Sequence, residues 1–205
     1  MQASESIISV CFNSSLLKYG GDIAVGAMTI LTSVMQFAML PLQGLGQGAQ
    51  PIISYNYGAR NVKRVKKAFW LLLKVSMAYA ILLWGGVMLF PQGFASLFTS
   101  DVALLAFTKD ALRIYVAALF IFGIQMACQM TFMSIGNAKA SIIVAVMRKF
   151  ILLIPLIYVM PAILKQNQTM AVYMAEPVAD VIAVTFTAIL FAVQFKNAMQ
   201  EISKQ

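Results

Sequence analysis

The chain has 205 residues, of which 61% are hydrophobic and 11% charged, and its mean hydropathy is +0.84. A soluble globular domain carries about 25% charged residues, so this composition excludes one and indicates a protein of the bilayer. The net charge of +8 does not indicate nucleic-acid binding, because most basic residues flank apolar segments, where they set orientation in the membrane. Cys11 and Cys128 lack metal or redox spacing, so we expect neither a disulfide nor a bound cofactor.

Hydropathy predicts an all-α membrane protein, in which residues 1–200 form one bundle of six transmembrane helices and residues 201–205 a cytoplasmic tail. The predicted spans are 3–17, 22–50, 68–90, 112–135, 141–163 and 170–195. All but the first reach the roughly 20 residues needed to cross a ~30 Å hydrocarbon core. The first would cover only about 22 Å at 1.5 Å per residue. We therefore expect its helix to begin before Met1, which would make the chain a fragment.

Basic residues predict the orientation. Five of them crowd the loop between the second and third spans: Arg60, Lys63, Arg64, Lys66 and Lys67. Every second loop is basic, so the positive-inside rule predicts a multi-pass protein of the cell membrane with both termini in the cytoplasm. The segment from Ser100 to Lys109 is predicted to form a short amphipathic helix on the outer surface, capped by Ser100 or Asp101.

Polar side chains recur inside two spans. In the second span they share one helical face: Thr29, Ser33, Gln36, Gln43, Gln47 and Gln50. This face either lines a cavity or joins helices through amide hydrogen bonds. The fourth span has a weaker face made of Tyr115, Phe122, Gln125, Gln129 and Phe132. Rings and amides together suit apolar or cationic organic ligands, and an aromatic packing face is an equal alternative.

Glycine and proline mark candidate packing and hinge positions. Gly44 and Gly48 form a GxxxG pair, which allows another helix to approach closely. Prolines are expected to break or bend their helices, and Pro41, Pro51 and Pro177 are therefore candidate hinges.

Three acidic residues lie inside spans: Glu5, Glu176 and Asp180. A carboxyl group in low dielectric can take up a proton or coordinate Na⁺, so each is a candidate for cation coupling. Glu176 and Asp180 are one helical turn apart and share a face. The alternative is a structural ion pair with Arg148 or Lys74.

Three motifs carry a family resemblance. The run PLQGLGQGAQP (41–51), followed by YNYGARN (55–61) and the basic stretch to Lys67, resembles the eighth helix and next cytoplasmic loop of the multidrug and toxic compound extrusion (MATE) family. QMTFMSIGNAKAS (129–141) resembles its turn between helices ten and eleven, and EPVAD (176–180) part of helix twelve. This family has twelve helices in two lobes, so the resemblance implies that the chain is the C-terminal lobe, helices seven to twelve.

The resemblance implies cation-coupled antiport, in which a cationic or amphipathic compound leaves the cell as H⁺ or Na⁺ enters. It also implies an N-terminal lobe as partner. Glu5 resembles an acid on the seventh helix that some members use for coupling. The tenth-helix acid that works beside it has no counterpart, since Gln125 and Gln129 occupy that region.

Other functional classes remain as alternatives. A lipid-linked precursor flippase of a related superfamily would need several basic residues in its cavity, and only Arg148 is a candidate. An inactive or regulatory truncated remnant is a further alternative. An enzyme is not expected, because the sequence has no His, no metal-ligand cluster and no nucleophile motif.

Overall fold

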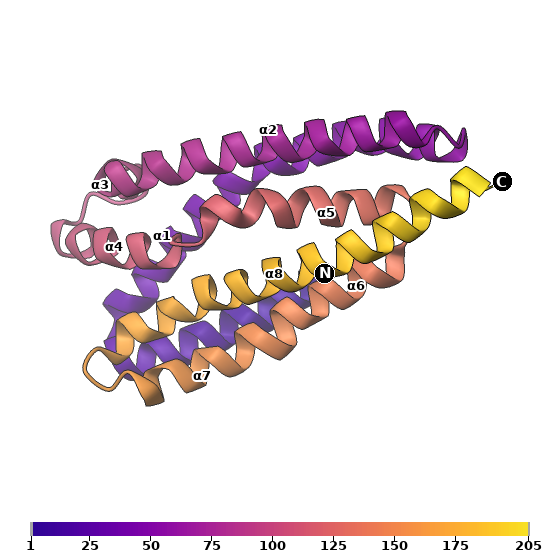
Figure 1. Cartoon of the computed structure of the whole chain (residues 1–205). Coiled ribbons are helices and arrows are strands. Elements are labelled where there is room, and N and C mark those ends of the chain that lie inside the picture. Colours follow the sequence, from indigo (N-terminus) through magenta and orange to yellow (C-terminus); the bar gives the residue numbers. More distant parts are fainter. Residues whose placement is uncertain (1, 205) are drawn as a thin grey trace.

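The computed structural model describes residues 2–204, and every secondary-structure element within this range is helical. Figure 1 shows long helices packed along one another in a bundle, with the connections at its two ends. In chain order the elements are α1 (Gln2–Gly58), α2 (Val62–Leu89), α3 (Pro91–Ser96), α4 (Val102–Tyr115), the 3₁₀ turn η1 (Leu119–Ile121), α5 (Phe122–Ser134), α6 (Ala138–Val146), the π-helical segment η2 (Met147–Leu153), α7 (Ile154–Ile163) and α8 (Gln168–Lys204).

Helix α1 turns sharply at Gly21, whose φ of 64° is a left-handed conformation that favours glycine. This kink divides α1 into two limbs, which correspond to the first two predicted spans. Hydroxyl groups of α8 bind carbonyls beside the kink: Thr169 Oγ1 donates to the Tyr19 carbonyl at 2.8 Å, and the Tyr173 hydroxyl to Ala24 at 2.7 Å. The second limb continues to Gly58, beyond the predicted end at residue 50.

Prolines do not end the long helices. Helix α1 continues through Pro41 and Pro51, and α8 through Pro177, so these residues do not break their helices, and their role as hinges stays a prediction. Neighbouring groups compensate for proline elsewhere. Because Pro161 has no N–H, the Ile157 carbonyl loses its helical partner, and the Ser15 hydroxyl lies 3.4 Å from it.

The fourth predicted span is broken. Helix α4 and the η1–α5 segment are bent by 44° relative to each other across a turn at residues 116–118, and together they are long and apolar enough for one crossing. Asp101 caps α4, since its carboxylate accepts hydrogen bonds from the backbone N–H groups of Ala103 and Leu104. The expected surface helix is therefore the first limb of this broken span. It extends to Tyr115, which is buried in the bundle.

Two of the quoted motifs contain the same kind of turn. After α1, Arg60 has φ of 57°, and the Asn61 side chain caps α2 by accepting from the Arg64 N–H at 3.1 Å. After α5, Gly136 has φ of 77°, and Asn137 caps α6 through the Ala140 N–H at 3.2 Å. A left-handed residue followed by an Asn cap explains GARN and IGNA locally.

Close helix contacts occur at glycines outside the GxxxG pair. A Cβ on Gly123 of α5 would lie 2.8 Å from the backbone of Ser76 in α2, and one on Gly46 would lie 2.5 Å from Met130 Cγ. At Gly44 and Gly48 no atom of the described residues, apart from the adjoining residues and backbone of the same helix, lies within 4 Å of a Cβ position. Among the described residues, no other helix therefore makes the close approach that this pair allows. Both glycines line an open groove between α1 and α2.

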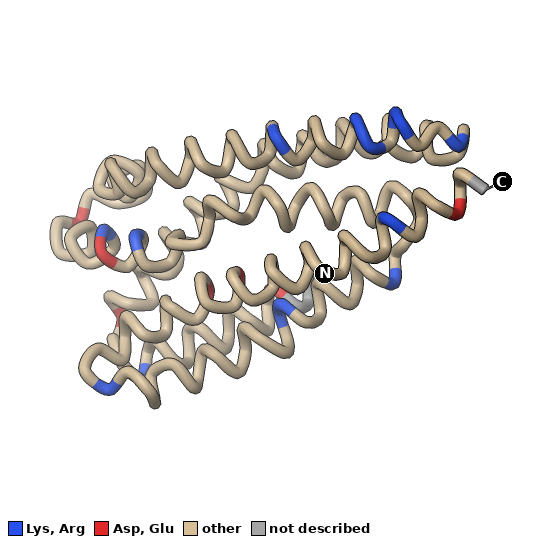
Figure 2. Tube along the Cα trace, in the orientation of Figure 1, with Lys and Arg blue, Asp and Glu red and all other residues tan. Residues whose placement is uncertain are grey.

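Charge is distributed unevenly along the bundle. Lys and Arg gather at the end where α2 begins and α8 ends, whereas the opposite end carries basic and acidic residues together (Figure 2). This asymmetry is the feature from which the positive-inside rule predicts orientation, and which side the basic end faces stays a prediction.

Candidate functional site

A cluster of charged side chains lies in the interior of the bundle, between η2 and α8. Arg148 Nε donates to Asp180 Oδ1 at 2.6 Å, and its Nη2 donates to Glu176 Oε1 at 2.7 Å. The side chains of Arg148, Glu176 and Asp180 are only 15%, 8% and 3% exposed. One guanidinium thus joins two acids one turn apart on α8, and the ion-pair alternative with Arg148 is the arrangement found.

A second ion pair adjoins the first. Lys149, the next residue of η2, binds Glu5 at the start of α1. The Lys149 side chain is 10% exposed and that of Glu5 66%. A π-helix is wound more widely than an α-helix, and here consecutive residues reach two different helices, α8 and α1. Two cations and three carboxylates therefore meet, which leaves one negative charge in excess.

The apolar surroundings strengthen these electrostatic interactions. The Arg148 guanidinium carbon lies 5.2 Å from the ring centroid of Phe122 on α5, a cation–π distance. Among the described residues no group of three His, Cys, Asp or Glu side chains is placed to hold a metal ion, so the three acids do not form one ligand set.

The second polar feature is the glutamine stripe, which we define as Gln36, Gln43, Gln47 and Gln50 of α1. The first three are exposed and the last is half-buried. No hydrogen bond joins these amides to the described residues. The opposite face of the same helix, with Leu31, Val34, Ala38 and Leu42, is buried in the bundle. The amides therefore face away from this bundle, as they would toward a cavity or partner outside it.

The two hydroxyl residues of the predicted face behave differently. Thr29 Oγ1 donates to the Val25 carbonyl at 3.2 Å, and Ser33 Oγ to the Thr29 carbonyl at 2.8 Å. Because each hydroxyl is satisfied within its own helix, neither needs an outside partner. On the predicted face from Thr29 to Gln50, the glutamines carry the polar groups that remain available to the surroundings.

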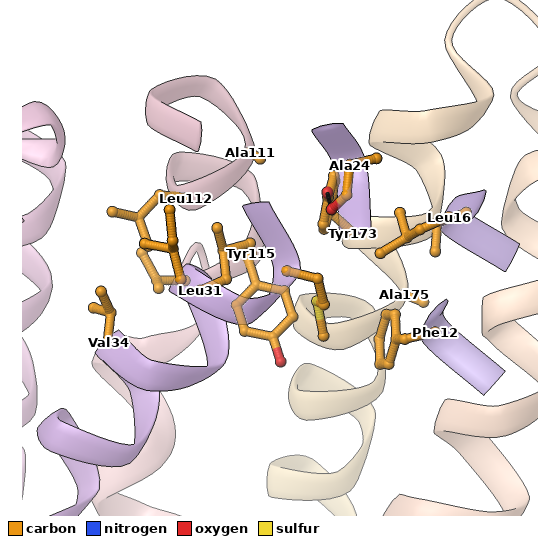
Figure 3. Packing of buried hydrophobic residues seen from close by; sticks show 14 of the residues in the cluster. Phe12, Leu16, Ala24, Leu31, Val34, Ala111, Leu112, Tyr115, Tyr173 and Ala175 are labelled. Atoms are coloured by element: carbon orange, nitrogen blue, oxygen red, sulfur yellow. Dashed lines mark hydrogen bonds between the residues drawn. The ribbon is translucent and has the colours of Figure 1, made fainter. Parts of the chain in front are cut away.

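The fourth-span residues proposed for the same cavity lie inside the bundle instead. Tyr115 is 6% exposed and packs edge-on against Phe12, with ring centroids 6.4 Å apart (Figure 3). Gln125 is 3% exposed, and its Oε1 accepts no hydrogen bond from the described residues. Gln129 is half-buried and lines a small groove beside Lys149. Tyr115 and Gln125 are thus packed within this bundle, as in the alternative of a packing face, and their place in a substrate cavity stays a prediction.

Sequence reasoning missed Lys149 as a site residue, because its charge also fits a residue near the start of a span. A usable signal was present. Arg148 and Lys149 stand about eight residues inside the apolar segment 141–163, where a charge needs a partner.

Comparisons with known proteins decide the family. A model of the MatE family matches residues 1–159. The chain belongs to the MatE family. The MATE resemblance of its motifs is thereby confirmed, and the chain is a multi-pass membrane protein.

Two relatives with curated names are transporters. The multidrug export protein MepA of Staphylococcus aureus is 26% identical over 149 residues, which cover 72% of this chain and 32% of MepA. The FAD transporter of Shewanella oneidensis is 28% identical over 133 residues, which cover 65% of this chain and 29% of that protein. The chain thus matches about a third of the length of these relatives.

Solved MATE structures have the same fold. A structure of the MATE multidrug transporter DinF-BH is 32% identical, with a TM-score of 0.80 over 97% of this chain and 44% of that one. A MOP superfamily transporter from Pyrococcus furiosus is 20% identical, with a TM-score of 0.87 over 100% of this chain and 45% of that one. The predicted all-α membrane bundle, one lobe of a MATE-like fold, is confirmed.

Proposed function

We propose that the chain is one lobe of an exporter in the cell membrane, with both termini in the cytoplasm. Together with a second lobe it moves drugs or other amphipathic or cationic organic compounds outward in exchange for H⁺ or Na⁺. The observation that carries this proposal is the glutamine stripe. Amides facing lipid would each cost free energy, so a face with three exposed glutamines favours a wet cavity opposite a second lobe.

The MatE relatives support the class of activity. MepA is named as a multidrug export protein, and DinF-BH as a multidrug transporter. Another relative is named as an FAD transporter, so the compounds in the relatives' names include a large aromatic cofactor. A cavity bordered by amides, which both donate and accept hydrogen bonds, suits organic compounds of differing polarity.

The charged cluster supplies a candidate for ion coupling. Glu176 and Asp180 face one guanidinium and are buried, so this group has one negative charge in excess, and an excess charge in an apolar site is stabilised by binding H⁺ or Na⁺. Glu176 and Asp180 share Arg148, so binding of a cation to either acid would weaken the hold on the guanidinium. In this proposal the exchanged cation acts by loosening the contact between η2 and α8.

The flippase alternative is disfavoured by the same cluster. Its basic residues are already paired with acids, so they do not offer a free positive surface for a pyrophosphate. The alternative of an inactive remnant predicts no export in any context, and transport measurements distinguish it.

Substitution of the glutamine stripe tests the proposal. In a complete reading frame that carries both lobes, Gln36→Leu or Gln43→Leu should change the spectrum of exported compounds several-fold, because the amide is lost at similar volume. The matched control is Phe37→Leu on the same helix, where the side chain is 70% exposed but about 100° from Gln36. The measurement is export of a panel of cationic and neutral dyes at equal expression. Equal changes for all three variants would contradict a cavity along the stripe.

A further inference from the structure

A groove runs between α2 and α8 over α5, at the basic end of the bundle. Figure 1 shows α5 between the two longer helices. The groove has a volume of about 690 Å³ and is mostly apolar, with Ile124 and Cys128 of α5 on its floor. We call it the α2–α8 groove. It is separate from both the charged cluster and the glutamine stripe.

Aromatic rings form one wall of this groove. Phe191 of α8 stacks on Phe69 of α2 with ring centroids 4.6 Å apart, and on Phe195 at 4.8 Å. Phe69 and Phe191 are each 5% exposed, so the stack is part of the packed interior. Trp70 stands beside it and is 56% exposed. A buried floor with an exposed tryptophan at the rim is typical of a surface at the membrane–water boundary.

Two lysines stand at the mouth of the α2–α8 groove, one from each helix. Lys66 lies in the first turns of α2 and Lys196 near the end of α8, and both are exposed. Neither forms an ion pair with the described residues. Trp70 follows Lys66 by one turn, so the cations lie outward of the aromatic wall. The groove thus presents positive charge at its mouth and apolar surface along its depth.

This combination matches an anionic phospholipid. Basic residues next to the cytoplasmic surface attract anionic headgroups, and apolar surface at membrane depth accommodates acyl chains. We propose that the α2–α8 groove binds one anionic phospholipid of the cytoplasmic leaflet, with its phosphate between Lys66 and Lys196 and an acyl chain along the aromatic wall. The site rests on the proposed orientation of the chain but not on export, so its test is a binding measurement.

Fluorescence quenching of Trp70 provides that test. The chain has two tryptophans, and Trp84 lies about 21 Å further along α2, toward the opposite end. With Trp84→Phe, the emission reports the groove alone. In phosphatidylcholine vesicles, brominated phosphatidylglycerol should quench Trp70 more than brominated phosphatidylcholine at equal mole fraction. In the converse variant, Trp70→Phe, the two lipids should quench Trp84 equally.

Variants that change charge or shape distinguish a specific lipid site from non-specific attraction of anionic lipid to the basic surface. Lys66→Gln with Lys196→Gln should weaken the preference for the anionic lipid by roughly five-fold per lysine. Each basic residue near an anionic membrane surface strengthens lipid binding by about this factor. The control Lys63→Gln with Lys139→Gln removes the same charge from residues outside the groove. Ala192→Phe, which fills the groove without changing charge, should reduce quenching, while Ala78→Phe on an exposed part of α2 should not.

The outcomes decide the proposal. Loss of preference in the groove variants, with the preference retained in the controls, supports it. Equal quenching by the two lipids overturns it, as does an equal loss in both lysine pairs, which would indicate a diffuse surface charge. Absence of quenching by either lipid also overturns it, because the groove would then be covered by protein.

Discussion

Replacing Arg148 with methionine should lower the free energy of unfolding by about 3–5 kcal/mol, the usual cost of removing one partner from a buried ion pair. Glu176 and Asp180, with side chains 8% and 3% exposed, would be left beside each other without their shared guanidinium. The check is unfolding of the purified chain in mixed micelles, followed by circular dichroism. Lys74→Met is the matched control, since Lys74 is exposed on α2 and should cost little.

The loss of unfolding free energy in Arg148→Met arises because Glu176 and Asp180 are left unpaired. Neutralising these two acids should therefore restore the stability. Arg148→Met combined with Glu176→Gln and Asp180→Asn replaces the cluster by neutral groups of similar size. Such replacement of a whole buried cluster is often neutral or stabilising. If Arg148→Met alone is as stable as Lys74→Met, the cluster does not hold η2 against α8. In a complete transporter, the triple variant should fold but lose ion-driven export.

Expression of the 205 residues alone should give membrane insertion without drug resistance. Insertion needs only apolar spans and basic loops, both of which are present. Alternating access needs a second lobe to move against, and the chain matches only 44–45% of the solved transporter chains. The assay is accumulation of a cationic dye in cells, with a complete two-lobe reading frame as the positive control.

A homodimer of this chain could confer drug resistance and so contradict this expectation. Two copies would insert in the same orientation, because the same basic loops direct both. Export that depends on an ion gradient, in cells that lack the complete protein, would show that two copies can replace a second lobe. Cross-linking between copies would then be expected as well.

The sequence was sufficient for those parts of the fold that follow from local chemistry. Long apolar segments predicted helices, and the family resemblance placed a loop at GARN and a turn at IGNA, where the structure shows asparagines that cap the next helix. The face shared by Glu176 and Asp180 also followed from helical spacing, and Arg148 was named as a candidate partner. These inferences involve residues within one turn of each other, or charges that have few partners within an apolar bundle.

Other features depend on contacts that no spacing reveals. The face proposed for Tyr115 and Gln125 assumed one continuous helix, but the chain bends by 44° across residues 116–118 and both side chains are buried. The GxxxG pair does not specify which helix would approach it, and no other helix of the described residues lies within 4 Å of a Cβ position there. The π-helical winding of η2, from which Arg148 and Lys149 reach different helices, had no signal in the sequence spacing.

Cysteine labelling along α1 tests the central claim most directly, namely that the glutamine stripe faces a water-filled cavity between two lobes. In a complete two-lobe protein with Cys11 and Cys128 replaced by alanine, single cysteines are placed at Gln43 and at Phe37, both exposed within this lobe. The account predicts rapid reaction of a polar maleimide with Gln43→Cys, slowed by a transported compound, and little reaction with Phe37→Cys in lipid. Equal reactivity at the two positions, or protection at neither, would contradict it.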